Sequence, residues 1–193
     1  MTPVPAALAW TRRLESASAL DPLVRTVRPL ADAFVADPVR RDVLRGAWLG
    51  HPLHPVLTDL PIGLWTSAVA LDLVGGRSAR PAATRLVGLG LLTAGPTAWS
   101  GWADWAALDQ PRQRVGVVHA ATNGVAVALF ASSWLARRRG AHGRGRTLGL
   151  AASSVLTVGG YLGGHLMANR VQATVDPGLG SPRPGPESTA TRA

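Results

Sequence analysis

The chain has 193 residues, a formal net charge of +9 and no cysteine. Without cysteine it can form no disulfide, thiolate metal site or cysteine nucleophile. All 20 basic residues are arginine, and they lie in the tails and between apolar runs, where a protein of the bilayer carries its positive charge. The charge therefore does not indicate nucleic-acid binding, and no nucleic acid is expected as a partner.

Residues 1–45 mix apolar positions such as Leu14 and Leu23 with Arg, Asp and Glu, and prolines such as Pro22 and Pro29 interrupt them. This mixture predicts short amphipathic helices that lie on the membrane surface or on the end of a helical bundle. We therefore expect an N-terminal interfacial segment rather than a separate domain.

Four long apolar segments follow, and they cover residues 53–74, 86–105, 115–135 and 148–169. At about 1.5 Å of rise per residue, each is long enough to cross a hydrocarbon core of roughly 30 Å. Their only charged side chains are Asp59, Asp72 and Asp104, whereas an amphipathic helix of a soluble protein carries charges along its wet face. A soluble bundle with unusually apolar helices is the alternative, although the mean hydropathy of +0.15 is lowered by the polar tails.

The loops between these segments are short, which forces an up-down-up-down order with antiparallel neighbours. The expected fold is all-α, an integral-membrane, multi-pass four-helix bundle over residues 46–170. Residues 171–193 are rich in Pro, Gly, Ser and Thr and are expected to be disordered. Five arginines and no acidic residue lie within 137–146, which favours a cytoplasmic position for the loops 75–85 and 136–147. Arginines beside the first segment weigh against that orientation.

The second half of the chain repeats features of the first. Residues 91–96 read LLTAGP and residues 155–160 read VLTVGG, an offset of 64 positions. The segment that begins at His54 similarly matches the segment that begins at His119, at an offset of 64 or 65. Two repeated helical hairpins, related by an axis along the membrane normal, would explain both matches. Chance similarity among helices rich in Leu, Ala and Gly is the alternative.

Four of the five histidines fall at one end of the predicted bundle. His51 and His54 start the first apolar segment, together with Asp59. His119 lies one turn into the third segment, and His165 lies one turn from the end of the fourth. Ionisable groups inside a membrane are costly and usually face a partner or a site. We therefore expect a cofactor or metal site at this end, with structural hydrogen bonding as the alternative.

The residues around these histidines form a longer pattern. Residues 48–55 read WLGHPLHP and residues 58–63 read TDLPIG, and the pattern continues through Gly101 and His119 to His165. It resembles a bacterial membrane family, the domain-of-unknown-function family 2231, over about 44–169. The resemblance implies a four-helix protein of the bacterial cytoplasmic membrane. Members joined to iron–sulfur or cytochrome-like modules imply a redox context, and in this chain the electron partner would be a separate protein or a quinone.

A b-type haem that passes electrons is the first functional hypothesis. A bis-histidine haem needs two imidazoles from facing helices at one depth. His54 and His119 occupy matching positions of the two hairpins and are expected to lie diagonally across the bundle, whereas His165 neighbours both and can replace either. The expected cofactor-binding residues are therefore His54, His119 and His165.

A zinc or copper site is the second hypothesis, because imidazole and carboxylate suit both metals. Three or four such ligands at about 2.0–2.2 Å make a closed site, and the expected set is His51, His54, His119, His165 and Asp59. The same groups can handle protons. A third hypothesis is a membrane scaffold without a cofactor. No Ser–His–Asp pattern and no paired carboxylates stand out, so a stand-alone enzyme is not expected, and a homo-oligomer remains open.

Overall fold

The computed structural model describes the backbone of residues 6–175 and the side chains of residues 8–168. The described part holds seven α-helices, two 3-10 turns and no strand, which confirms the all-α class. In chain order the elements are α1 (Ala6–Ser16), η1 (Ser18–Leu20), α2 (Asp21–Phe34), α3 (Pro38–Arg45), η2 (Ala47–Leu49), α4 (Leu53–Val74), α5 (Arg80–Trp105), α6 (Gln110–Arg138) and α7 (His142–Val175).

The four predicted apolar segments are four long helices, three of them longer than expected. α4 has the predicted bounds, whereas α5, α6 and α7 begin before the predicted residue. Pro81 lies in the first turn of α5, where the missing N–H of proline costs nothing. Asp109 caps α6 by accepting a hydrogen bond from the backbone N–H of Arg112 at 3.1 Å. The arginine-rich stretches that composition assigns to loops are helical because arginine is a good helix former.

The predicted boundary of the C-terminal tail is wrong by five residues. α7 continues to Val175, so residues 171–175 are helical. The remainder of the predicted disordered tail, residues 176–193, and the first five residues of the N-terminal segment lie outside the described residues.

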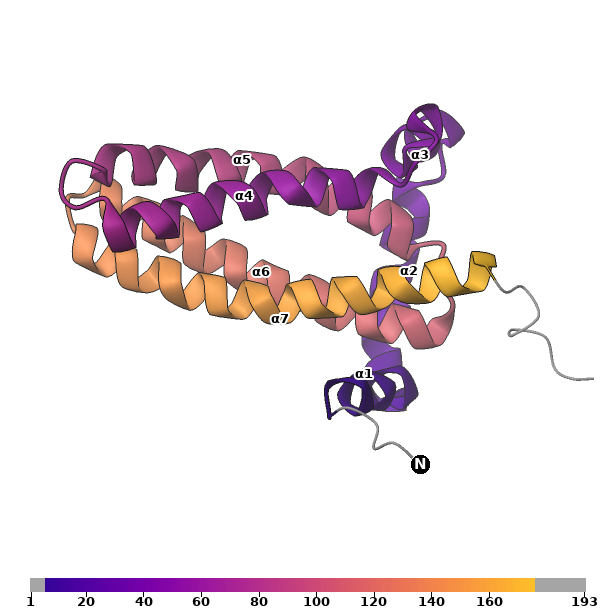
Figure 1. The fold of residues 1–193 in the computed structure, drawn as a ribbon. Helices are drawn as coiled ribbons and strands as arrows, with labels where there is room; N and C mark the ends of the chain where they lie inside the picture. Colours follow the sequence, from indigo (N-terminus) through magenta and orange to yellow (C-terminus); the bar gives the residue numbers. More distant parts are fainter. Residues whose placement is uncertain (1–5, 176–193) are drawn as a thin grey trace, which may run out of the picture.

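The four long helices lie side by side, and three shorter helices cross one end of them (Figure 1). α4 packs along α5, and α6 packs along α7. α5 also contacts α6, and α4 contacts α7, so α4 and α6 face each other diagonally. Four membrane-spanning helices were predicted, but length and hydropathy support two of them. Among the described helices, α4 and α6 are long and apolar enough to cross a membrane.

Glycines in α5 and α7 lower their hydropathy, and several of them receive large side chains from the neighbouring helix. A Cβ at Gly90 of α5 would meet the indole of Trp65 from α4, and a Cβ at Gly145 of α7 would meet Arg137 from α6. Small residues of this kind let helices approach closely in a bilayer. Gly90 and Gly145 thus let α5 and α7 pack closely against their hairpin partners.

Two stacked aromatic rings form the middle of the bundle. Trp65 of α4 lies on Phe130 of α6, with ring centroids 4.2 Å apart and planes 12° apart. Phe130 is fully buried, and the Trp65 indole N–H donates to the Val87 carbonyl at 3.2 Å. Ala68, Val87 and Ala152 complete this buried cluster. Since Phe130 follows Trp65 by 65 positions, the contact joins matching positions of the two predicted repeats.

A buried ion pair joins the same two helices where α4 ends. Arg137 Nη1 donates to Asp72 Oδ1 at 2.8 Å, and Nη2 donates to the other carboxylate oxygen. Arg137 Nε also donates to Ser133 Oγ at 3.1 Å, and Ser133 in turn donates to the Gly145 carbonyl at 2.6 Å. The side chains of Arg137 and Asp72 are 1% and 8% exposed. Arg137 is thus part of the bundle interior rather than of a loop.

The N-terminal helices pack on the end where α4 begins. Val24 and Ala31 of α2 are buried with Trp105 of α5 and Val117 of α6. Ser100 of α5 donates to the Leu44 carbonyl at 2.7 Å. The N-terminal segment was predicted to lie on the membrane surface or on the bundle end, and these contacts place it on the bundle end.

Replacing Gly90 by alanine should destabilise the bundle, because the new Cβ would lie 2.6 Å from Trp65 Cδ1 and 2.8 Å from its Cε2. Overpacking a core costs about 1–3 kcal/mol, and we expect a loss of that size in denaturant unfolding of the detergent-purified protein. Gly95→Ala is the matched control, because a Cβ there has nothing within 4 Å. Equal stability of the two variants would contradict the packing of Trp65 against α5.

Asp72→Asn should cost about 3–5 kcal/mol of unfolding free energy, because it leaves the buried Arg137 guanidinium without its counter-charge. Asp32→Asn breaks an exposed pair with Arg28 (2.9 Å) and should cost less than about 1 kcal/mol. The same unfolding experiment compares the two. If Asp72→Asn were as mild as Asp32→Asn, the buried pair would not hold α4 against α6.

Candidate functional site

His54 and His119 meet inside the bundle near the end that the N-terminal helices cover. His54 lies in the first turn of α4, and His119 lies in the third turn of α6. Their ring centroids are 6.4 Å apart, and their planes are nearly perpendicular at 88°. The two imidazoles therefore lie at one depth and face each other across the diagonal of the four long helices.

Each imidazole is held by a backbone carbonyl of the neighbouring helix. His54 Nδ1 lies 2.9 Å from the Thr97 carbonyl oxygen of α5, and His119 Nδ1 lies 2.8 Å from the Gly159 carbonyl oxygen of α7. Because a carbonyl oxygen only accepts, Nδ1 carries the hydrogen in both rings. In a neutral imidazole this leaves the lone pair on Nε2, which is the arrangement of a metal-ligating histidine.

A glycine four residues after each accepting carbonyl makes room for the ring. A Cβ at Gly101 would lie 2.9 Å from His54 Cε1, and a Cβ at Gly163 would lie 2.9 Å from His119 Cε1. Both glycines follow their carbonyls by one helical turn, so each ring lies against the helix that binds it with its Cε1 edge toward the glycine. The matching contacts in α5 and α7 are thus 62 positions apart, compared with an offset of 64 between the LLTAGP and VLTVGG runs.

The two halves of the site differ at one side chain. Asn123 of α6 places its amide nitrogen 3.1 Å from His119 Nε2, and its carbonyl oxygen is buried without a hydrogen-bond partner among the described residues. The matching residue of α4, 65 positions earlier, is Thr58, which donates to the His54 carbonyl at 2.7 Å. An amide therefore occupies the lone pair of His119 in this structure.

A family model described as Predicted membrane protein (DUF2231) matches residues 50–177, which are 128 of the 193 residues. The chain belongs to this family. The match confirms the resemblance that the WLGHPLHP pattern indicates, and it contains both histidines together with their carbonyl and glycine contacts. Searches of curated proteins and of solved structures give no significant match.

Within the DUF2231 domain, His165 takes a different position from the predicted one. Its Nε2 lies 2.9 Å from Glu15 Oε1, so it joins α7 to the N-terminal helix α1 outside the matched range. The physical reason is helical phase. His165 follows Gly163 by two residues, which is about 200° around α7, so it points away from the side on which Gly163 receives His119.

His51 and Asp59 also lie apart from the pair. His51 is exposed, and its Nδ1 is 3.1 Å from the carbonyl oxygen of the adjacent Pro52. Asp59 is exposed and follows His54 by five residues, about 140° away around α4. Among the described residues there is no group of three or more His, Asp or Glu side chains arranged for a metal ion. The structure thus brings together two members of the predicted set of five.

Sequence reasoning did not identify the residues that orient the pair. Thr97 and Gly159 contribute main-chain carbonyls, which no side-chain motif reveals. The glycines were accessible to analysis. Gly101 and Gly163 each belong to a short run in which the accepting residue, Thr97 or Gly159, lies four positions earlier, and that spacing marks one helix face.

An ion pair fastens the N-terminal helices beside the DUF2231 domain. Arg114 of α6 donates to both carboxylate oxygens of Asp21, at 2.7 and 3.0 Å, and to the Glu15 carbonyl at 2.7 Å. The hydrogen bonds from the Arg114 guanidinium hold the pKa of Asp21 below its usual value. A carboxyl group whose pKa is lower in the folded protein stabilises the fold at every pH above its ordinary, unfolded-state pKa. This stabilisation is lost as the pH falls through the lowered, folded-state pKa.

Asp21→Asn should therefore lower the melting temperature at neutral pH and weaken its decrease on acidification below about pH 4, the ordinary carboxyl range. Melting curves of the purified protein across this pH range measure both effects. Asp42→Asn is the control, since Asp42 pairs with its chain neighbour Arg41 at the surface. If the two variants gave the same pH profile, the Arg114 contact would not fasten the N-terminal helices.

Proposed function

We propose that the chain is a multi-pass protein of the bacterial cytoplasmic membrane and that all four helices α4–α7 cross the bilayer. α4 and α6 have the length and composition of spans, and both begin at the end where α1–α3 lie (Figure 1). Because α5 leads from the end of α4 back to the start of α6, two parallel spans require α5 to return across the same thickness. α7 packs along α6 and carries no charge between Arg146 and Arg170, which supports a fourth span.

We further propose that His54 and His119 are the axial ligands of a b-type haem and that the protein passes electrons. The observation that carries this proposal is the facing imidazole pair, with each Nδ1–H fixed on a backbone carbonyl. Two imidazoles that bound one metal from opposite sides at about 2.0 Å would hold their ring centres roughly 6.3 Å apart, which matches the 6.4 Å observed. The carbonyl bonds also make the imidazoles more basic and hence better ligands.

The number of available ligands favours haem over zinc. A closed zinc site takes three or four protein ligands, whereas a porphyrin supplies the equatorial ligands of its iron and needs two axial side chains. The described residues offer a pair and no larger His, Asp or Glu group. Copper bound by two histidines is the second candidate, because imidazole suits copper.

Each residue of the site has a distinct role in this proposal. The Thr97 and Gly159 carbonyls orient the rings, and Gly101 and Gly163 leave them space. Asn123 donates to His119 Nε2, and this amide must turn away before His119 can bind a metal. A bound haem supplies one-electron transfer, and because the chain has no cysteine for an iron–sulfur cluster, electrons pass to a separate protein or to a quinone.

The test is the absorption spectrum of the detergent-purified protein, produced with added haem precursor and recorded before and after reduction with dithionite. We expect a Soret band that sharpens on reduction, with split visible bands. His54→Ala and His119→Ala should each abolish the low-spin spectrum. His142→Ala is the matched control, because His142 begins α7 at the opposite end of the bundle, and it should leave the spectrum unchanged.

Gly163→Ala separates loss of a ligand from loss of the fold. Its Cβ would displace the His119 ring without removing the imidazole, so the bands should shift in a protein that still folds, with a loss of stability no larger than that of Gly90→Ala. A flat spectrum from well-folded protein would refute the haem proposal. Elemental analysis would then distinguish bound copper or zinc from a membrane scaffold without a cofactor.

A further inference from the structure

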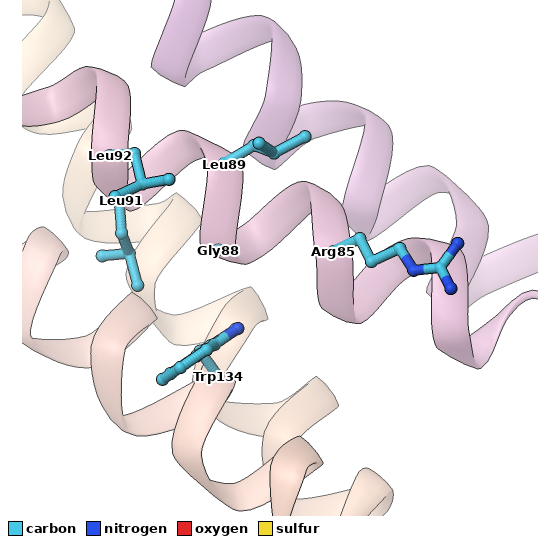
Figure 2. A pocket seen from close by; sticks show the side chains of 6 residues that line it. All are labelled: Arg85, Gly88, Leu89, Leu91, Leu92 and Trp134. Atoms are coloured by element: carbon cyan, nitrogen blue, oxygen red, sulfur yellow. The ribbon is translucent and has the colours of Figure 1, made fainter.

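A groove on the outside of the bundle lies between α5 and α6, far from the histidine pair. It has a volume of about 460 Å³ and is lined by Arg85, Gly88, Leu89, Leu91, Leu92 and Trp134. Figure 2 shows the Trp134 ring across from Gly88, with Leu91 directed toward the same gap. A Cβ at Gly88 would lie 2.8 Å from Trp134 Nε1, so the glycine lets the indole approach α5. Apart from Arg85, the lining side chains offer an apolar surface.

Two arginines lie beside this groove. Arg85 lies at one end of it (Figure 2), and the Arg138 guanidinium lies 5.4 Å from the centroid of the Trp134 ring. The same end of the bundle exposes seven arginines, which are Arg77, Arg80, Arg85, Arg138, Arg139, Arg144 and Arg146. The sequence has no acidic residue between Asp72 and Asp104 or between Asp109 and Asp176, and Asp72 is paired with Arg137. This end therefore carries a large unbalanced positive charge.

We propose that this groove binds one acyl chain of an anionic phospholipid, whose phosphate is held by Arg85 and Arg138. The inference rests on the proposed membrane topology, because the groove meets lipid only if α5 and α6 cross the bilayer. An acyl chain fits an apolar groove that faces hydrocarbon, and Arg side chains bind phosphate through charge-assisted hydrogen bonds. A basic site beside spanning helices is the arrangement that recognises anionic headgroups at the cytoplasmic face. Trp134 lies one turn before the end of α6, and indoles are enriched at such helix ends, where a span meets the membrane interface.

Other occupants match only one half of the site. Free phosphate would use the arginines and leave the leucines unfilled, whereas a zwitterionic phospholipid would fill the groove and gain little from the excess positive charge. An anionic phospholipid matches both the apolar lining and the charge. Because α4 also ends here, the bound lipid would lie at the end where the Asp72–Arg137 pair joins α4 to α6.

The test compares lipids with identical dioleoyl chains and different headgroups, by native mass spectrometry and by melting temperature of the full chain in detergent. We expect dioleoyl-phosphatidylglycerol to bind about tenfold more tightly than dioleoyl-phosphatidylcholine, as expected for one to two arginines near an anionic headgroup. Inorganic phosphate alone should not raise the melting temperature. Equal binding of the two lipids, or equal stabilisation by phosphate, would overturn the proposal.

Variants then distinguish a built site from diffuse charge. Arg85→Gln and Arg138→Gln should each reduce the preference for the anionic lipid several-fold. Arg144→Gln removes the same charge from the same end on α7, outside the groove lining, and should leave the preference intact. If all three variants behaved alike, the arginine-rich end would act only as a surface charge, which would refute the site.

A further measurement distinguishes failure of the lipid site from failure of the proposed membrane-spanning arrangement. Insertion of the wild-type chain into vesicles, measured by resistance to alkaline carbonate extraction, reports whether it spans the bilayer. An inserted protein that shows no headgroup preference would refute the lipid site alone, whereas a chain that is extracted would refute the topology on which the site depends.

Discussion

The structure depends on large side chains of one helix resting on glycines of its neighbour, with backbone carbonyls as hydrogen-bond acceptors. His54 and Trp65 bond to α5 in this way, and His119 bonds to α7. In a bilayer core no water is present to satisfy a buried polar group, so partners must come from the protein itself. Helical carbonyls retain an acceptor lone pair, and glycine is the residue that lets a ring reach them. These contacts join the two helices of each hairpin along their length.

Because both hairpins use the same construction, matching positions of α4 and α6 point to a common axis and meet there in layers. His54 faces His119 at one end, Trp65 stacks on Phe130 in the middle, and Asp72 binds Arg137 at the other end. Each pair is separated by 65 positions. Since the two side chains at matching positions of α4 and α6 contact each other on this axis, they must be able to pack against or bind one another. Stacked rings satisfy this directly, a charged layer requires opposite charges in the two repeats, and the two imidazoles meet edge to face.

Several features were predictable from particular residues. The uncharged runs identified the long helices, and the double-histidine proline pattern identified the family. The matching positions of His54 and His119 predicted that they oppose each other diagonally. The prediction that four histidines converge included too many residues. It used only their position along the helix axes and did not use the direction in which each side chain points around its helix. Counting about 100° per residue separates His165 from the Gly163 face and Asp59 from the His54 face without any structure.

The sequence by itself determined the helical class, the family and the matching positions of His54 and His119, because these follow from local composition and from a repeated pattern along the chain. Only the tertiary structure decided the partners of those side chains. The carbonyl of Thr97, the pairing of Asp72 with Arg137 and the contact between His165 and Glu15 join residues 43, 65 and 150 positions apart. Main-chain acceptors have no residue type that marks them, and helix-to-helix contacts depend on register and rotation. Both quantities are set by packing, which a linear pattern does not contain.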